Sequence, residues 1–304
     1  MTATASPAAS PAAVPPLTWL YVPGDRPAVV AKALASGADA VVIDLEDAVA
    51  ADRKSYALRA TAELLAAPRP VGPAPAPALH VRVNALTGPR SATEIRMLAA
   101  LPGLAGLRLP KVSGAADIGR AAAWAAAAGS GRPEEVPPLY ALLESALGVE
   151  HAFAVATAHP ALCGISLGEA DLRAELGVRD EDGLGWARGR TVVAARAAGL
   201  PPPPQSVFPD LRDTGALAAS CARGRALGFL GRAALHPRQL PVIERAYLPT
   251  PEEVERAGET VRAAAGQPGA CALPDGRFVD PAVVADARRT LALAARRPRY
   301  GDGR

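Results

Sequence analysis

Cysteines and aromatic side chains are scarce in this sequence. The 304 residues include three cysteines, and aromatic residues make up 4% of the chain. Cys163, Cys221 and Cys271 lie far apart without a CxxC pair, which is typical of reduced thiols that pack rather than react. The sequence also lacks HExxH motifs, Cys/His clusters and EF-hand loops, so zinc and calcium sites are not expected. We expect a cytoplasmic protein.

Lysine is scarce as well. Of the 33 basic residues, only Lys32, Lys54 and Lys111 are lysines. In a chain that otherwise uses arginine, a lysine that is kept suggests that a compact ammonium group is needed at its position.

No charge or apolar pattern points to nucleic acid or to a membrane. The formal net charge is +3 and the basic residues are scattered, so no nucleic-acid surface is expected. No apolar run approaches the length of a membrane span. Residues 1–16 are rich in Ala, Pro, Ser and Thr without the features of a signal peptide, so we expect a disordered leader there and a disordered tail over 299–304.

A repeated pattern of apolar strand, polar strand end and Ala-rich helical segment runs through the chain. Residues 40–43 show no polar–apolar alternation, so we expect a strand buried on both faces, with Asp44, Glu46 and Asp47 directly after it. The same succession recurs at 80–84 with Arg82 and Asn84, at 106–111 with Lys111, at 139–144 with Glu144, and at 162–171 with Glu169 and Asp171.

Polar side chains at the C-terminal end of nearly every strand are typical of a (β/α)8 TIM barrel, which builds its active site on that face. A doubly wound sheet is the alternative, but it would gather its polar residues at one switch point. Strands at 17–22, 206–208 and 228–230 complete the expected set. We therefore predict an α/β fold with a barrel over 17–248 and a C-terminal helical extension over 249–298, which is either a lid or an oligomer contact.

Glu144 and Asp171 are candidate metal ligands. They follow neighbouring strands and can face one pocket, where they leave room for a hard cation that keeps waters and takes oxygens from its substrate. Mg²⁺ prefers this kind of site, and Mn²⁺ is the other option. The alternative is that both acids simply pair with Arg82 or Lys111.

Arg82 and Lys111 are candidate substrate-binding residues. Arg82 lies in the middle of a buried strand, so its guanidinium needs an anionic partner, for which Glu46, Asp47 and a bound carboxylate are candidates. Lys111 at its strand end keeps a Schiff-base mechanism formally open.

Two further cations follow the first strand. Arg26 precedes Pro27, which suits the first position of a helix, and Lys32 lies farther along that helix. Such a pair suits a phosphate-bearing ligand, although an ordinary surface pair is the simpler interpretation from these residues alone. His236 opens a helix before Pro237, so we expect a structural hydrogen bond rather than a catalytic base.

Eight short motifs follow one another in the order found in a known family. They are LYVPGDRP at 20–27, DLEDAV at 44–49, VRVN at 81–84, LPK at 109–111, LES at 143–145, LGEADL at 167–172, LHPRQ at 235–239 and VDP at 279–281. From about residue 18 to 296 the chain thus resembles the citrate lyase beta subunit-like (CitE-like) CoA-ester lyases of the HpcH/HpaI aldolase superfamily, which includes malyl-CoA and citramalyl-CoA lyases.

The resemblance implies a Mg²⁺-dependent barrel enzyme, assembled as a trimer or hexamer. Such an enzyme makes or breaks the carbon–carbon bond between an acyl-CoA enolate and a 2-oxo acid. The resemblance implies that Glu144 and Asp171 hold the metal. It also implies that Arg82 binds the oxo-acid carboxylate and polarises its carbonyl.

Residues farther from the metal also receive roles from the resemblance. Arg26 and Lys32 would meet the phosphates of a CoA thioester substrate. Asp280, on the extension, would act as acid and base in the site of a neighbouring subunit. Glu46 and Asp47 would support the catalytic residues.

The chain departs from the family pattern at Ser145, where Thr is usual, at Arg232, where Lys is usual, and at Gln205, where many members carry Asp. The last two bear on substrate range. Two alternatives stay open beside a free-standing CoA-ester lyase. One is the beta subunit of a multi-subunit citrate lyase that cleaves a citryl thioester to oxaloacetate, and the other is a malyl-CoA thioesterase. A class II pyruvate-type aldolase would not need the extension that carries Asp280.

Overall fold

The computed structural model describes residues 15–68, 76–129, 136–266, 269–273, 276–296 and 299–300. They fall into two compact units, one of Pro16–Tyr247 with residues 299–300 and one of the described residues of 248–298. Most of the predicted leader and of the predicted tail lies outside the described residues. No helix in these ranges is long and apolar enough to cross a membrane.

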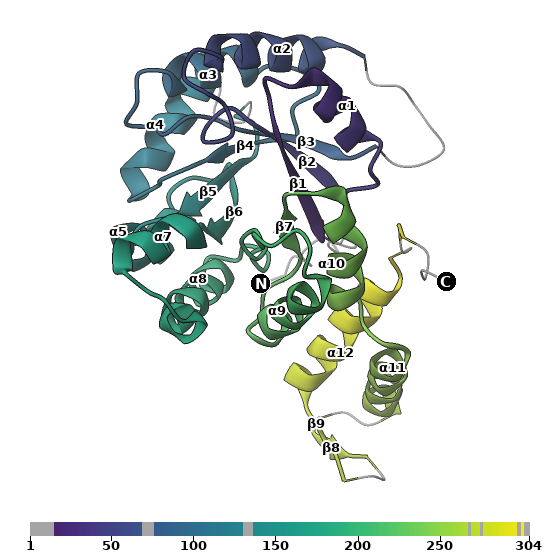
Figure 1. The fold of residues 1–304 in the computed structure, drawn as a ribbon. Coiled ribbons are helices and arrows are strands. Elements are labelled where there is room, and N and C mark those ends of the chain that lie inside the picture. Colours follow the sequence, from purple (N-terminus) through teal and green to yellow (C-terminus); the bar gives the residue numbers. More distant parts are fainter. Residues whose placement is uncertain are drawn as a thin grey trace, which may run out of the picture. The chain divides into compact units, whose positions relative to one another are not determined.

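The larger unit is an α/β fold built on one parallel sheet (Figure 1). In the described chain, seven strands pair in the order β6-β5-β4-β3-β2-β1-β7, each parallel to its neighbours. The strands are β1 (Thr18–Pro23), β2 (Ala40–Asp44), β3 (Ala78–Arg82), β4 (Gly106–Leu109), β5 (Leu139–Leu143), β6 (Leu162–Leu167) and β7 (Arg232–Ala234). Successive strands lie side by side and the sheet curls, as in folds of the TIM-barrel kind.

Helices follow the strands in the chain and pack on the outer face of the sheet (Figure 1). They are α1 (Pro27–Leu34), α2 (Lys54–Ala66), α3 (Ser91–Leu98), α4 (Ala115–Ala126), α5 (Ala146–Glu150), α6 (Ala152–Ala156), α7 (Glu169–Leu176), α8 (Gly185–Ala197), α9 (Thr214–Ala226) and α10 (Leu240–Tyr247), with short 3-10 helices at Glu181–Leu184 and Pro237–Gln239.

Alternation along the strands divides the buried side chains between two faces. Ile43 of β2 is 1% exposed and borders a small apolar pocket between the sheet and helices α1 and α2. Trp19 and Val42 belong to a cluster on the other face, against which Tyr140 packs. The rings of Trp19 and Tyr140 come from strands that are not neighbours, yet their centroids are 6.0 Å apart. This second face is therefore the inside of the curl.

The final strand of the sheet is not where the sequence predicted it. It is β7 at Arg232–Ala234 rather than 228–230. Gly228 and Gly231 have φ of 94° and 79°, so the chain turns at both positions before it pairs. A Cβ on Gly231 would lie 2.5 Å from the carbonyl oxygen of Leu17, so this turn packs tightly against the start of β1.

Two other predicted strands also differ from those in the structure. In place of a strand at 206–208, Gln205 forms a single parallel bridge with Arg232. Strand β6 ends at Leu167, so Asp171 lies in the first turn of α7 and not on a strand. A carboxylate in the first turn of a helix is stabilised by the helix dipole.

The smaller unit contains α11 (Pro251–Gly266) and α12 (Pro281–Ala294), which pack on each other, and an antiparallel pair of β8 (Cys271–Ala272) and β9 (Phe278–Val279). Helix α11 begins with a capping box. Thr250 Oγ1 accepts a hydrogen bond from the Glu253 N–H at 3.2 Å, and Glu253 Oε2 accepts one from the Thr250 N–H at 2.8 Å.

Candidate active site

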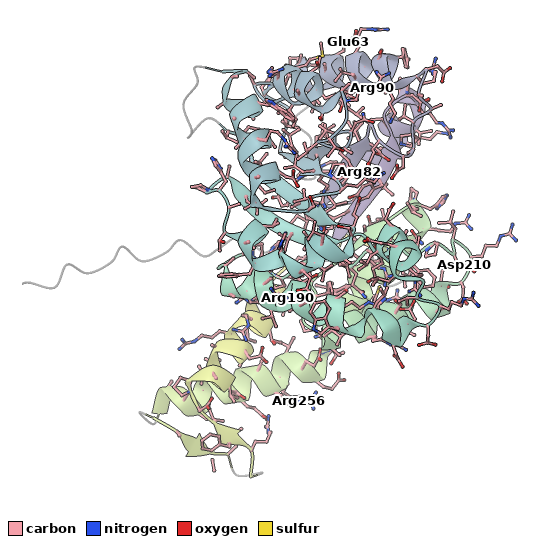
Figure 2. All side chains as sticks on the ribbon, turned by 90° about the vertical axis from the view of Figure 1, so that its left-hand side faces the viewer. Glu63, Arg82, Arg90, Arg190, Asp210 and Arg256 are labelled. Carbon is pink, nitrogen blue, oxygen red and sulfur yellow. The ribbon has the colours of Figure 1, made fainter. Side chains whose placement is uncertain are left out.

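A cavity of about 450 Å³ opens where the parallel strands end. Four residues predicted for the site line it, namely Asp47, Arg82, Glu144 and Asp171. Figure 2 shows Arg82 among the strands of the larger unit. The parallel sheet therefore brings together side chains that lie more than 120 positions apart in the sequence.

Arg82 is held by a carboxylate that the sequence analysis did not name as its partner. Asp44 is its register partner on β2, and Arg82 donates from Nε to Oδ1 at 2.8 Å and from Nη2 to Oδ2 at 2.6 Å. Both expected partners also contact it, with Nη1 at 2.9 Å from Glu46 Oε2 and 3.4 Å from Asp47 Oδ2. Burial alone would lower the pKa of Arg82, but Asp44 raises it, so the guanidinium stays charged and fixed in orientation.

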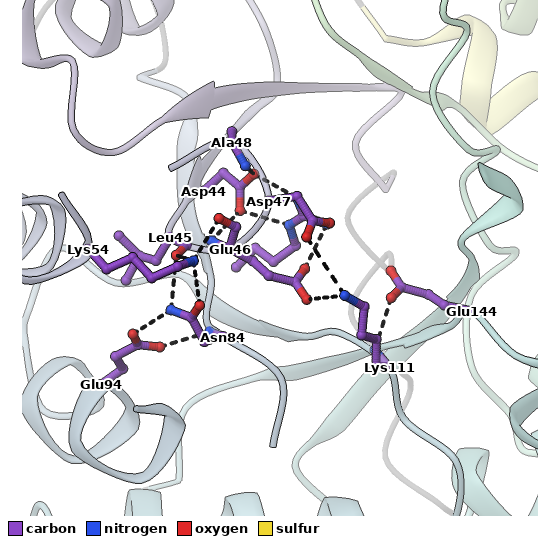
Figure 3. Close-up of polar contacts among 11 residues, drawn as sticks. Asp44, Leu45, Glu46, Asp47, Ala48, Lys54, Asn84, Glu94, Lys111 and Glu144 are labelled. Atoms are coloured by element: carbon purple, nitrogen blue, oxygen red, sulfur yellow. Dashed lines mark hydrogen bonds and ion pairs between the residues drawn. The ribbon is translucent and has the colours of Figure 1, made fainter. Parts of the chain in front are cut away.

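Lys111 extends this charge network (Figure 3). Its Nζ lies 3.1 Å from Glu46 Oε1 and 3.7 Å from Asp47 Oδ1. Burial lowers the pKa of Lys111, but the contact and charge of Glu46 raise it overall, so the amine stays protonated and is a poor Schiff-base nucleophile. Lys111 has a φ of 54°, a left-handed conformation that is uncommon for a residue with a side chain. Its N–H donates to Glu144 Oε2 at 3.1 Å.

A second polar network fixes the turn after β2, and the sequence analysis assigned it no role. Lys54 Nζ donates to the carbonyl oxygens of Leu45 at 2.9 Å and Glu46 at 2.8 Å, and to Asn84 Oδ1 at 2.6 Å (Figure 3). Asn84 Nδ2 in turn donates to Glu94 Oε1 at 2.6 Å. The available signals were the scarcity of lysine and the position of Asn84 at a strand end.

Glu144 is the most strongly perturbed acid of the cavity. Its pKa is raised to about 8. Burial is the main cause, the negative charges of Glu46 and Asp171 add to it, and Arg82 opposes it. A Cβ on Gly168 would lie 2.4 Å from Glu144 Cγ, so the close approach of the two strand ends requires glycine there. Glu144 is therefore packed in place, and its charge is only partly balanced by the protein.

These surroundings fit a hard divalent cation. Two carboxylates supply the oxygen donors that Mg²⁺ prefers, and a cation beside Glu144 would stabilise its ionised form, which burial and the neighbouring acids disfavour. Among the described residues, no group of three or more His, Cys, Asp or Glu side chains is placed to hold a metal ion. Glu144 and Asp171 would hold Mg²⁺ together with water and substrate oxygens, as is usual for this ion.

The residues predicted for CoA binding and proton transfer lie away from this network. Arg26 caps the N-terminus of α1 and is exposed, and Lys32 lies in the last turn of the same helix. Neither lines the cavity. Asp280 belongs to the smaller unit, where its Oδ1 accepts a hydrogen bond from the Val283 N–H at 2.9 Å and caps α12.

Two other polar residues named in the sequence analysis, Glu169 and His236, form hydrogen bonds within the fold. Glu169 accepts hydrogen bonds from Arg188 Nε at 2.9 Å and Nη2 at 2.6 Å. His236 Nδ1 accepts from the Arg238 N–H at 3.1 Å, so the expected structural hydrogen bond is confirmed.

The two departures from the family pattern that bear on substrate range touch each other. Arg232 Nη1 donates to Gln205 Oε1 at 3.1 Å, and Tyr247 Oη donates to the same oxygen at 2.6 Å. Gln205 lines the cavity, whereas Arg232 lies behind it and is 4% exposed. The wall at this point is therefore neutral on the Gln205 side.

The curled parallel sheet and the carboxylate-lined cavity at its strand ends define an α/β fold of the TIM-barrel kind with a site of the sort that enzymes use. The chain belongs to the HpcH/HpaI aldolase/citrate lyase family, whose model matches residues 17–237.

Curated relatives carry three kinds of name. A (3S)-malyl-CoA thioesterase of Cereibacter sphaeroides is 35% identical over 90% of this chain and 93% of its own. The citrate lyase subunit beta of Leuconostoc mesenteroides is 33% identical over 91% and 92%. An L-malyl-CoA/beta-methylmalyl-CoA lyase of Cereibacter sphaeroides is 30% identical over 91% and 94%.

A solved structure agrees in fold and sequence. Mycobacterium tuberculosis CitE, in complex with magnesium, acetoacetate and coenzyme A, matches with a TM-score of 0.73 and 31% identity. The match covers 93% of this chain and 99% of that chain.

Proposed function

We propose that this protein is a Mg²⁺-dependent carbon–carbon lyase acting on a 3-hydroxyacyl-CoA such as malyl-CoA or citramalyl-CoA. The products are an acyl-CoA and a 2-oxo acid, and the reaction is reversible. The observation that carries the proposal is the pairing, in one cavity, of two oxygen ligands for a metal with a fixed guanidinium. The family membership and the relatives named as malyl-CoA lyases support it.

In the cleavage direction the 3-hydroxyl loses its proton and the bond between the α carbon and the carbinol carbon breaks. The carbinol carbon becomes the carbonyl of the 2-oxo acid, and the electron pair forms an enolate on the thioester side, which then takes up a proton. When bound, Mg²⁺ would withdraw charge from the oxygens of the oxo acid. Arg82 places a second positive charge at the same wall, held in orientation by Asp44.

The remaining residues have supporting roles in this proposal. Glu46 and Asp47 hold Arg82 and Lys111 in position, and Lys111 binds the anionic substrate through its charge. Arg26 and Lys32 bind the CoA phosphates.

The proposal extends to the whole chain. Gln205 and β7 complete a closed (β/α)8 barrel over 17–248, and the C-terminal helical extension over 249–298 brings Asp280 to the site of a neighbouring subunit as acid and base. The assembly is a homotrimer or homohexamer, located in the cytoplasm.

The relatives also favour one alternative reaction and one alternative context. The malyl-CoA thioesterase is the more similar relative by identity, and hydrolysis would release CoA together with the intact hydroxy acid. The citrate lyase subunit beta would act on an acyl-carrier thioester in place of free CoA.

One assay separates these reactions. Purified protein is incubated with Mg²⁺, acetyl-CoA or propionyl-CoA and a panel of 2-oxo acids, while free CoA and condensed thioester are both monitored. A lyase forms the condensed thioester without releasing CoA, and it cleaves malyl-CoA to acetyl-CoA and glyoxylate. A thioesterase releases CoA from malyl-CoA without forming a 2-oxo acid. If the protein transforms no free CoA ester, the carrier-dependent alternative replaces the proposal.

A further inference from the structure

A second arginine lies deeper in the same cavity. Arg108 of β4 is 2% exposed and lines the cavity wall. Its guanidinium carbon lies 4.2 Å from the ring centroid of Trp19 and 5.3 Å from that of Tyr140, and the ring of His80 packs between those of Trp19 and Tyr140. We call Arg108 and these three rings the aromatic floor.

Among the residues that the structure describes, the charge of Arg108 has no anionic partner. Its Nε and Nη2 are buried without a hydrogen-bond acceptor, and no described carboxylate forms an ion pair with it. The indole Nε1 of Trp19, which also lines the cavity, is a second buried donor without an acceptor. A buried cation is costly unless an anion or a set of acceptors compensates it. Because Arg108 also lines the cavity, an anionic ligand in the cavity would balance its charge.

The aromatic floor is a shaped feature of the strands. A Cβ on Gly106 would lie 2.8 Å from atoms of both His80 and Tyr140, and a Cβ on Gly164 would lie 3.0 Å from Tyr140. Glycines on β4 and β6 thus make room for the rings. Burial, followed by the positive charge of Arg108, lowers the pKa of His80 far below its ordinary value. His80 is therefore neutral, and Arg108 carries the positive charge of the floor.

The two cavity arginines lie on neighbouring strands beside the same aromatic ring. Arg82 and Arg108 are register partners on neighbouring strands. Their guanidinium carbons lie 5.6 Å and 6.0 Å from the ring centroid of Tyr21, which lines the cavity with them. Arg82 is paired with protein carboxylates, whereas Arg108 forms no ion pair with a described carboxylate.

We propose that Arg108 binds a second carboxylate of the 2-oxo acid, so that the protein prefers 2-oxo dicarboxylates to 2-oxo monocarboxylates. The inference rests on the proposed lyase function and narrows its substrate class. Malyl-CoA and citramalyl-CoA yield the monocarboxylates glyoxylate and pyruvate, so the preferred 3-hydroxyacyl-CoA would carry one carboxylate more than these two, as citryl-CoA does. The first carboxylate and the carbonyl face Arg82, Glu144 and Asp171, and the second lies against the guanidinium of Arg108.

The test compares oxaloacetate with pyruvate, which differ by one carboxylate. The condensation rate is measured at saturating acetyl-CoA for the wild type, Arg108→Met, Arg108→Lys and a control, Arg96→Met, at an exposed position of α3. Losing a charge-assisted hydrogen bond should raise the KM for oxaloacetate in Arg108→Met by about 10- to 100-fold, with the KM for pyruvate within about threefold of the wild type. The control should change neither value.

Thermal unfolding separates a binding role from a structural one. If Arg108 serves to bind a ligand, Arg108→Met without ligand should unfold at a temperature equal to or above that of the wild type, because the substitution removes an unpaired buried charge. Arg108→Lys keeps the positive charge but replaces the planar guanidinium with a single ammonium group, so its KM for oxaloacetate should rise about tenfold. Equal KM changes for both acids, or a lower unfolding temperature with the preference intact, would overturn the inference.

Calorimetric titration of the two acids into the Mg²⁺-loaded protein, without thioester, distinguishes this inference from the proposed function. A preference for oxaloacetate that Arg108→Met removes, in a protein that forms no carbon–carbon bond, supports the floor site and refutes the lyase reaction. Condensation with pyruvate and oxaloacetate at equal KM supports the lyase and refutes the floor site.

Discussion

Arg82 and Arg108 occupy paired positions on neighbouring strands of one sheet, yet their surroundings differ in charge. Arg82 lies in a carboxylate rim, which we define as Asp44, Glu46, Asp47 and Glu144 at the strand ends. Arg108 lies among aromatic rings and has no carboxylate partner among the described residues. The rim has more negative than positive charge, and the floor has the opposite imbalance.

The difference separates two parts of the cavity. The protein itself orients Arg82 in the rim, whereas the charge of Arg108 in the floor is left for a ligand to balance. The two-pronged contact with Asp44 sets the orientation of Arg82 before any substrate arrives. The imbalance of the rim suits a bound cation, and that of the floor suits a bound anion. Each prediction below changes one side of this comparison and leaves the other in place.

The largest effect is expected from the two proposed metal ligands, Glu144 of the rim and Asp171. Glu144→Gln keeps the shape of the side chain but removes its charge, and Asp171→Asn does the same on α7. Each variant should lose Mg²⁺-dependent turnover by about 1000-fold or more, because several kcal/mol of charge stabilisation depend on the metal. Initial rates over a Mg²⁺ titration measure the loss, with Glu150→Gln, at an exposed position of α5, as the matched control.

Near-normal turnover of either variant at low Mg²⁺ would contradict the assignment. If the two acids served only to pair with Arg82 or Lys111, the variants would instead lose thermal stability and keep their dependence on the metal.

Variants of Asp280 test whether one chain supplies all the residues of the proposed active site. The Asp280 carboxylate caps α12, so Asp280→Ala would also cost about 1 kcal/mol of stability through the lost cap. Asp280→Asn keeps a good cap and removes the acid–base function, and we expect a loss of about 100-fold or more in turnover with binding of Mg²⁺ and CoA intact. Rates and calorimetric titrations of both variants separate the two roles.

Mixing Asp280→Asn with Glu144→Gln under conditions of subunit exchange should restore part of the activity. A mixed assembly can join an intact barrel of one subunit to an intact Asp280 of another. Exchange that is demonstrated by mass labels without recovered activity would show that Asp280 serves its own chain or has no catalytic role.

Arg82→Lys changes the fixed arginine without removing its charge. A single ammonium cannot reproduce the two contacts with Asp44, so the positive charge at the cavity wall loses its set orientation. We expect kcat to fall by about 100-fold for every 2-oxo acid, with the KM for the thioester unchanged. In contrast to Arg108→Met, the variant should not alter the preference between oxaloacetate and pyruvate, which a side-by-side kinetic panel measures.

The sequence predicted the rim better than the floor, for a physical reason. Parallel strands that end in polar residues must place those residues at one edge, so Arg82, Lys111 and Glu144 were expected there from local pattern alone. Arg108 stands in the apolar run Gly106–Leu109, where one charged residue reads as part of the strand. Its role depends on rings supplied by three other strands, which no local pattern reveals.

Other differences between the predicted and the observed structure also depend on how separate strands and helices meet. Asp44 was seen as part of an acidic cluster, but its pairing with Arg82 follows from the register between two strands that are 38 residues apart. The strand expected at 228–230 was apolar enough, yet two glycines with positive φ turn the chain and delay pairing until Arg232. Asp171 was expected on a strand because the apolar run before it hides the start of α7.

Arg26→Ala tests a cation outside both regions. Arg26 is exposed and does not line the cavity, so its proposed contact with the CoA phosphates is made equally in the ground state and the transition state. The KM for the thioester should rise about three- to tenfold with little change in kcat. Steady-state kinetics at low and high salt provide the measurement. The effect should shrink at high salt, since exposed charges are screened. A fall in kcat alone would place Arg26 in the chemistry.

The smallest effect is expected in the titration of His80 on the floor. Burial is the main cause of its lowered pKa, and the positive charge of Arg108 is the second, so Arg108→Met should raise the pKa of His80 but leave it below the ordinary value of 6.5. Because the folded protein keeps His80 neutral while the unfolded chain protonates it near 6.5, the wild type loses stability as the pH falls below that value. Arg108→Met should show a weaker loss over the same window. Chemical denaturation from pH 7 to pH 5 measures the slope, and an NMR titration of the histidine ring protons assigns it to His80. An unchanged pKa of His80 in Arg108→Met would mean that burial alone keeps the ring neutral. It would also mean that a group other than a bound substrate balances the charge of Arg108.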